Sequence, residues 1–183
     1  WMFKTPAGGY TSDPTESQRM ALGSAQPWFT YGWNNVFKYK NFDLTAFFRG
    51  VIGNKILNVT RWAYGPNQPS IPGLATESMN IFMKDVKDGI YTNKKNFSDY
   101  YLESGSYVKL DNLTIGYNYL VKSSKYLQSM RIYFTGQNLL TLTSYSGQDP
   151  EVNTTSVWNP GIDYPSFYPR VATLLIGVNV NLK

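Results

Sequence analysis

Apolar and polar residues alternate along the last stretch of the chain, from residue 171 to residue 183. One parity is apolar throughout: Leu174, Ile176, Val178, Val180 and Leu182. The other parity is small or polar except at Leu175: Thr173, Gly177, Asn179 and Asn181. Successive side chains of a β-strand point to opposite faces, so the stretch predicts a strand with one apolar and one polar face. Such a strand suits a wall between lipid and a polar lumen.

The same alternation recurs upstream and predicts five strands in all. They cover about residues 28–39, 41–52, 105–119, 130–140 and 171–183. A tight link at residues 38–41 predicts that the first two strands form a hairpin. Within the third strand the apolar parity changes between Leu110 and Leu113, which predicts a β-bulge near Asp111 and Asn112.

Long and short connections alternate between these strands. The long ones cover about residues 1–27, 53–104 and 141–170, and a short helix is expected within them at 76–88. Outer-membrane barrels have short periplasmic turns and long extracellular loops. The pattern therefore predicts an all-β fold, an antiparallel transmembrane β-barrel with its C-terminal end in the periplasm and its long loops outside the cell.

The number of strands bears on how much of a barrel the chain supplies. Membrane barrels have at least about eight strands, so five do not close one. Five strands alone would also leave two sheet edges unpaired. We therefore expect the chain to be part of a larger sheet and a larger protein.

Composition excludes several other classes of protein. Charged residues make up 16% of the 183 residues, below the roughly 25% of an average soluble domain. No apolar run approaches the roughly 18 residues of a transmembrane helix. The net charge of +5 forms no basic stripe, so no nucleic-acid partner is predicted.

The chain offers little catalytic chemistry. It has no cysteine, so it has no thiolate nucleophile or thiolate metal site. It also has no histidine, the commonest general base and the commonest neutral metal ligand. Asp149 and Glu151 lie two residues apart on a predicted loop, whereas a glycosidase places two carboxylates on opposite sides of the scissile bond. We predict no catalytic residue, no metal site and no cofactor, and an enzyme is the weakest interpretation.

The alternation assigns side chains to the two faces of the predicted sheet. The residues expected to face lipid are Trp33, Phe42, Phe48, Ile115, Ile176 and Val180. The residues expected to face the lumen are Asn34, Asp43, Arg49, Asn118, Gln137 and Asn179. Outer-membrane lipid is thus an expected partner of the first set.

Six stretches, in order, resemble the C-terminal end of a SusC/RagA-type TonB-dependent outer-membrane transporter of the Bacteroidetes. They are Ala25–Asn35, Tyr39–Leu44, Ser104–Tyr117, Gly136–Thr141, Gly147–Glu151 and the stretch from Gly161 to the end. The resemblance implies that the chain holds about the last five strands of a 22-stranded plugged barrel. The plug domain and the TonB box would lie outside this chain. Barrels of this kind usually finish with an aromatic residue, whereas this chain ends Leu182-Lys183.

The same resemblance implies the function and the partners. Such transporters import oligosaccharides or peptides, are powered by TonB, and work with a SusD-like surface lipoprotein as a lid. This chain would contribute barrel wall and extracellular loops. It would contact the rest of its own barrel and the plug, and TonB would act through the missing N-terminal part.

Several loop residues are candidates for contact with the lid or the substrate. They are Trp62, Tyr64, Tyr145, Asp149, Glu151, Trp158, Tyr164 and Phe167. Aromatic faces stack on sugar rings and anchor protein interfaces, but they also pack loops against one another or form an interfacial belt. The rival interpretation of the whole chain is a soluble β-sandwich that binds carbohydrate.

Overall fold

The structure is a computed structural model that describes residues 2–64, 98–121, 123–152, 158–165 and 168–183. The chain divides into two units. The first comprises Trp1–Gln26, Asn54–Ser104 and Glu151–Phe167, and the second comprises Pro27–Gly53, Gly105–Pro150 and Tyr168–Lys183.

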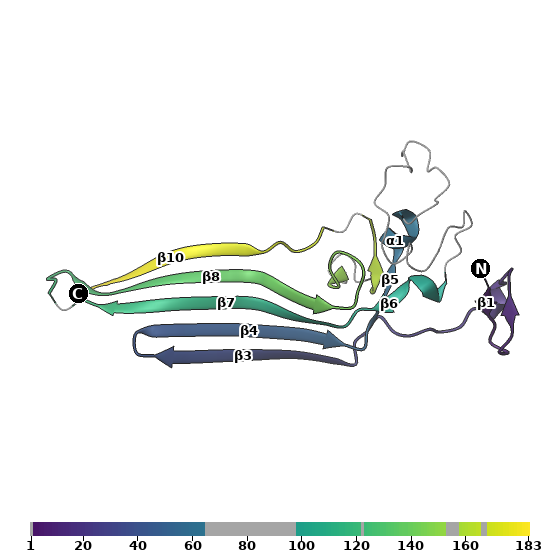
Figure 1. The fold of residues 1–183 in the computed structure, drawn as a ribbon, viewed down its shortest axis with the longest axis horizontal. Coiled ribbons are helices and arrows are strands. Elements are labelled where there is room, and N and C mark those ends of the chain that lie inside the picture. Colours follow the sequence, from purple (N-terminus) through teal and green to yellow (C-terminus); the bar gives the residue numbers. More distant parts are fainter. Residues whose placement is uncertain (1, 65–97, 122, 153–157, 166–167) are drawn as a thin grey trace, which may run out of the picture. The chain divides into compact units, whose positions relative to one another are not determined.

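The second unit is a five-stranded antiparallel sheet. Its strands are β3 (Phe29–Tyr39), β4 (Phe42–Ile52), β7 (Tyr107–Leu120), β8 (Leu127–Thr143) and β10 (Thr173–Leu182). They lie side by side in the order β10-β8-β7-β4-β3 (Figure 1). The β3–β4 turn, the β7–β8 turn and the last residue of β10 share one end of the sheet, which we call the short-turn end.

Each of the five predicted strands is present, although the limits of one were wrong. β8 begins at Leu127 and ends at Thr143, whereas the alternation predicted about 130–140. Its first residues pair on both sides, because Ser129 lies opposite Leu120 of β7 and Asn181 of β10. The turn between β7 and β8 is therefore shorter than the predicted strand limits implied.

The predicted hairpin and the predicted bulge are both confirmed. β3 and β4 pair without a break from Tyr39↔Phe42 to Phe29↔Ile52. The turn places Lys40 at a φ of 51°, in the left-handed region that tight hairpin turns use. Along β7, Phe47 lies opposite Asn112 but Phe48 lies opposite Leu110, so Asp111 is the extra residue.

The bulge keeps the two halves of β7 in phase. Because Asp111 is extra, Val108 and Leu110 share a face with Ile115 and Tyr117 despite their opposite sequence parity. Without the extra residue, one half of the strand would turn its apolar side chains to the opposite face.

The first unit holds shorter elements that the alternation did not predict. They are β1 (Phe3–Lys4), β2 (Tyr10–Thr11), η1 (Glu16–Gln18), β5 (Lys55–Asn58), α1 (Val59–Tyr64), η3 (Asp99–Tyr101), β6 (Leu102–Ser104) and β9 (Ile162–Asp163). β1 pairs with β2, and β5 lies between an antiparallel β6 and a parallel β9. Ile56 and Tyr101 are buried here. The predicted long connections are therefore partly ordered into small sheets.

Two points concern helices. The helix expected at 76–88 lies outside the described residues. In the part of the chain that is described, none of the helices has the length and apolar character needed to cross a membrane.

Deleting Asp111 tests the role of the bulge. The deletion shifts residues 107–110 by one position, which turns Lys109 toward the apolar side and Val108 toward the polar side. We expect the full-length protein to lose its folded, heat-modifiable form on gels. Deletion of Ser123 in the β7–β8 turn is the control and should leave that form in place. If both deletions behaved alike, the bulge would not be what keeps the apolar side chains of β7 on one face.

Candidate functional site

One face of the five-stranded sheet is apolar. The register places all six residues that the alternation assigned to lipid on this face: Trp33, Phe42, Phe48, Ile115, Ile176 and Val180. Five of these side chains are exposed, with Ile176 75% and Trp33 64% exposed, and Phe48 is half-buried. We call this surface the apolar face.

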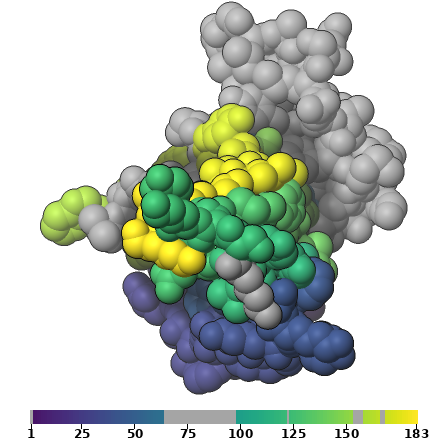
Figure 2. All heavy atoms as spheres, turned by 90° about the vertical axis from the view of Figure 1, so that its left-hand side faces the viewer, coloured from purple at the N-terminus to yellow at the C-terminus, as the bar shows by residue number. Residues whose placement is uncertain are grey.

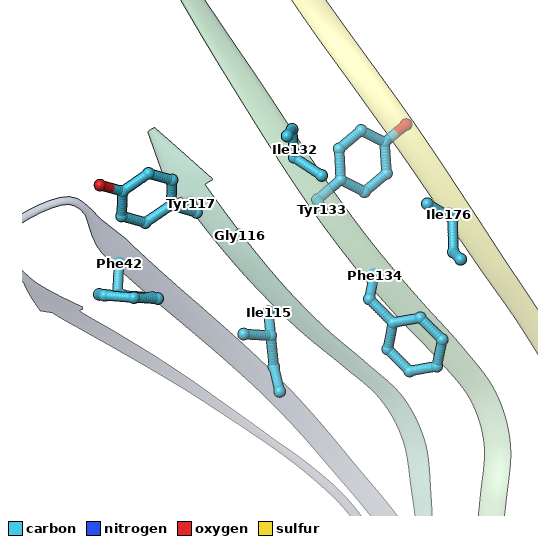
Figure 3. Close-up of a pocket in the computed structure, with 8 residues that line it drawn as sticks. All are labelled: Phe42, Ile115, Gly116, Tyr117, Ile132, Tyr133, Phe134 and Ile176. Atoms are coloured by element: carbon cyan, nitrogen blue, oxygen red, sulfur yellow. The ribbon is translucent and has the colours of Figure 1, made fainter. Parts of the chain in front are cut away.

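A shallow groove of about 300 Å³ runs along the apolar face. Its apolar side chains come from four strands: Phe42, Ile115, Tyr117, Ile132, Phe134 and Ile176 (Figure 3). The rings of Phe42 and Tyr117 lie 4.8 Å apart at the short-turn end of the groove. The groove carries no carboxylate or amine, so it can hold an apolar chain but offers no reactive group.

The opposite face is polar. All six residues assigned to the lumen share it: Asn34, Asp43, Arg49, Asn118, Gln137 and Asn179. Val36 and Leu175 are exposed apolar exceptions on the same face. The register thus separates the two predicted sets completely, while what each face contacts stays a prediction. We call this surface the polar face.

An ion pair joins three strands on the polar face. Arg131 of β8 donates two hydrogen bonds to the carboxylate of Asp43 on β4, one of them from Nε at 3.1 Å. Asn118 of the intervening β7 donates from Nδ2 to the same carboxylate at 2.7 Å. The guanidinium also lies 5.0 Å from the ring of Tyr133. A two-point Arg–carboxylate pair is directional as well as charged, so it favours one register across the three strands.

Gly116 makes room for this ion pair. It lies opposite Asp43 on one side and Tyr133 on the other. A Cβ at Gly116 would come within 2.6 Å of Arg131 Nη2 and 2.7 Å of Asp43 Oδ1. The glycine therefore lets the arginine lie across β7 to reach the carboxylate.

Two further ion pairs lie toward the long-loop end of the polar face. Arg49 contacts the bulge residue Asp111 at 3.0 Å and donates to the hydroxyl of Tyr107 at 3.1 Å. Lys109 is 1% exposed and lies 3.6 Å from Asp149. Asp149 also accepts a hydrogen bond from the backbone N–H of Arg170 at 3.2 Å. The buried carboxylate of Asp149 thus links β7 to both ends of the connection between β8 and β10.

The candidate loop residues fall into different environments. Tyr145, Asp149 and Glu151 are buried. Their burial matches the alternative in which these residues pack loops together, and their side chains are not exposed for contact with a lid or a substrate. Trp158 is 90% exposed and Tyr164 is also exposed. Phe167 lies outside the described residues, as does the side chain of Tyr64.

A buried charge network that the sequence did not reveal lies next to Trp62 in the chain. Arg61, which precedes the half-buried Trp62, is fully buried and donates to Glu103 at 2.7 Å. The Arg61 guanidinium also lies 4.3 Å from the ring of Tyr100. Arg61 and Glu103 are 42 residues apart, so alternation within one strand carries no sign of their contact.

Metal ligands do not gather in the described part of the chain. Over those residues, three or more Asp, Glu, Cys or His side chains nowhere come together in a metal-binding arrangement. The charged side chains described above are instead engaged in ion pairs, which is a structural use of charge.

Two curated proteins are similar to this chain in sequence. TonB-dependent receptor P3 of Formosa agariphila is 37% identical over 181 residues, which cover 90% of this chain and 17% of the relative. TonB-dependent receptor SusC of Bacteroides thetaiotaomicron is 28% identical over 156 residues, covering 81% of this chain and 14% of that protein. The chain therefore spans less than a fifth of the length of these curated relatives. No family model matches the chain.

The fold also matches a solved structure. The RagAB peptide importer in its open-open state aligns with a TM-score of 0.75 and 20% identity, over 98% of this chain and 20% of the matched chain. At that identity the likeness concerns the fold alone.

Replacing Gly116 tests the three-strand ion pair. We expect Gly116→Ala to lower stability by about 1–3 kcal/mol, since the added methyl displaces Arg131 from Asp43. Gly32→Ala is the matched control, because its Cβ meets only the ring edge of Phe47 at 3.3 Å. The temperature at which the full-length protein loses its compact gel mobility measures both; an equal effect at Gly32 and Gly116 would argue against the pair as the cause.

Proposed function

We propose that this chain, a segment of a TonB-dependent receptor of the SusC/RagA family, forms part of the outer-membrane barrel wall of a nutrient importer. The separation of the two faces supports the proposal most directly. A sheet with exposed apolar side chains on one face and ion pairs on the other fits a wall between hydrocarbon and a polar lumen. The apolar face then meets lipid, and the polar face lines the lumen.

In this proposal the lengths of the connections set which end of the sheet faces the periplasm. The short-turn end lies on the periplasmic side and the long connections lie outside the cell. The unpaired edges of β3 and β10 accept the neighbouring strands of a 22-stranded barrel, of which this chain supplies about the last five. Pairing of both edges also removes the exposed backbone groups that favour aggregation.

Cargo and partners are proposed from the relatives. The matched solved structure is that of a peptide importer, and SusC is a TonB-dependent receptor. We propose that the whole protein imports peptides or oligosaccharides with energy from TonB, beneath a SusD-like surface lipoprotein. Trp158 and Tyr164 are exposed, and we propose them as the loop residues that contact that lipoprotein or the cargo.

The rival β-sandwich places a second sheet over the apolar face. Sandwiches bury that face in a core about 10 Å thick. Among the described residues, Trp33, Ile115 and Ile176 all remain exposed instead. The observation favours the membrane wall.

Arginine substitutions at adjacent positions of β10 test which face meets lipid. Ile176→Arg places a charge on the apolar face, which costs about 2–4 kcal/mol near the bilayer midplane, so we expect little assembled protein in the outer membrane. Leu175→Arg is the matched control on the polar face, where the charge stays in water. Immunoblots of outer-membrane fractions measure both variants of the full-length protein, and normal levels of Ile176→Arg would refute the assignment.

Growth of the source bacterium tests import. Deletion of the full gene should abolish growth on one class of oligosaccharide or peptide supplied as sole nutrient, while growth on the corresponding monomers continues. A wild-type copy should restore growth, and a copy carrying Ile176→Arg should not. Unchanged growth on every oligosaccharide and peptide tried would count against the proposed activity.

A further inference from the structure

Cations and aromatic rings gather at the short-turn end of the sheet. In the β3–β4 turn, the ammonium of Lys40 lies 5.3 Å from the centre of the Tyr39 ring. In the β7–β8 turn, the ammonium of Lys125 lies 6.0 Å from the ring of Tyr126. Both tyrosines are at least 70% exposed. Figure 2 looks onto this end, with the β3–β4 turn in blue, the β7–β8 turn in green and the end of β10 in yellow.

The charge of this end is positive. Among the described residues of the two turns and the strand ends beside them, the one carboxylate side chain is that of Asp43, and Arg131 already neutralises it. Lys40 and Lys125 therefore face no acidic partner there, and Lys183 donates to the backbone oxygen of Ser124. An anionic group meets attraction at this end and little repulsion.

The apolar groove reaches the same end. Phe42, which lines the groove, lies opposite Tyr39 in the register. The hydroxyl of Tyr117, also in the groove lining, accepts a hydrogen bond from Asn41 Nδ2 at 3.5 Å. The groove thus passes from Phe134 and Ile176 toward Tyr117 (Figure 3). The Tyr117 hydroxyl contacts Asn41, which follows Lys40 in the β3–β4 turn.

We propose that this groove binds one anionic phospholipid. An acyl chain lies along the apolar side chains, and the phosphate lies at the short-turn end beside Lys40, Asn41 and Tyr117. Lys125 strengthens the field without needing direct contact. Lysine and tyrosine side chains with apolar stems and polar tips suit this depth of a membrane. The proposal rests on the proposed placement of the apolar face against lipid.

Lipid titration of the full-length receptor tests the site. Native mass spectrometry of the detergent-purified protein should show phosphatidylglycerol bound at least about 5-fold more tightly than phosphatidylcholine, since each lysine near an anionic headgroup contributes about 1 kcal/mol. Lys40→Gln with Lys125→Gln should weaken phosphatidylglycerol binding by up to about 30-fold and leave phosphatidylcholine unchanged. Ile132→Trp, which fills the groove, should weaken both lipids.

A control of equal charge separates the site from bulk electrostatics. Lys4→Gln with Arg19→Gln removes two exposed cations from the first unit and should leave lipid binding unchanged. No preference for phosphatidylglycerol, or equal losses in the two double variants, would overturn the proposal. If the receptor still fractionates with the outer membrane, such a result would overturn only the lipid site and leave the proposed function standing. A receptor that is soluble without detergent would refute the proposed function itself.

Discussion

The hydrogen-bonding register of the five strands is the constraint on which the structure depends. Each strand has a period of two, so a slip by one residue would exchange its apolar and polar faces. From β3 to β10 the pairings keep Trp33, Phe48 and Ile176 on one face and Asn34, Asp43 and Asn179 on the other. Where the sequence parity changes, Asp111 is inserted as a bulge and the phase is restored. The proposed membrane wall requires that phase, because a charge in hydrocarbon is costly.

Charge on the polar face is balanced locally. Asp43 pairs with Arg131, Arg49 with Asp111, and Lys109 with Asp149, so each partly buried charge has an opposite charge within about 4 Å. Removing one partner of such a pair costs more than the pair contributes, since the other charge remains desolvated. The cations of the short turns differ, because Lys40 and Lys125 lie over tyrosine rings at an exposed end.

Alternation predicted the strands well because burial on one face is a local property of the sequence. It missed both limits of β8, which runs from Leu127 to Thr143. Near the second limit Asn138 adopts a φ of 52°, and the register with β7 skips Asn138 and Leu139. It did not predict that Arg131 reaches Asp43, since the two are 88 residues apart and the register is set by strand pairing. Short strands such as β5 and β9 carry too few residues to show a period, and their pairing depends on contacts over 100 residues apart.

The central claim is that the apolar face contacts lipid and the polar face contacts water. Spin labels at Ile176 and Leu175 test it directly, because these neighbours on β10 point to opposite faces. In the full-length receptor reconstituted in vesicles, power saturation should show the label at 176 accessible to oxygen and shielded from a water-soluble nickel reagent. The label at 175 should be reached by the nickel reagent. The reverse pattern, or equal access of the nickel reagent to both positions, would contradict the account.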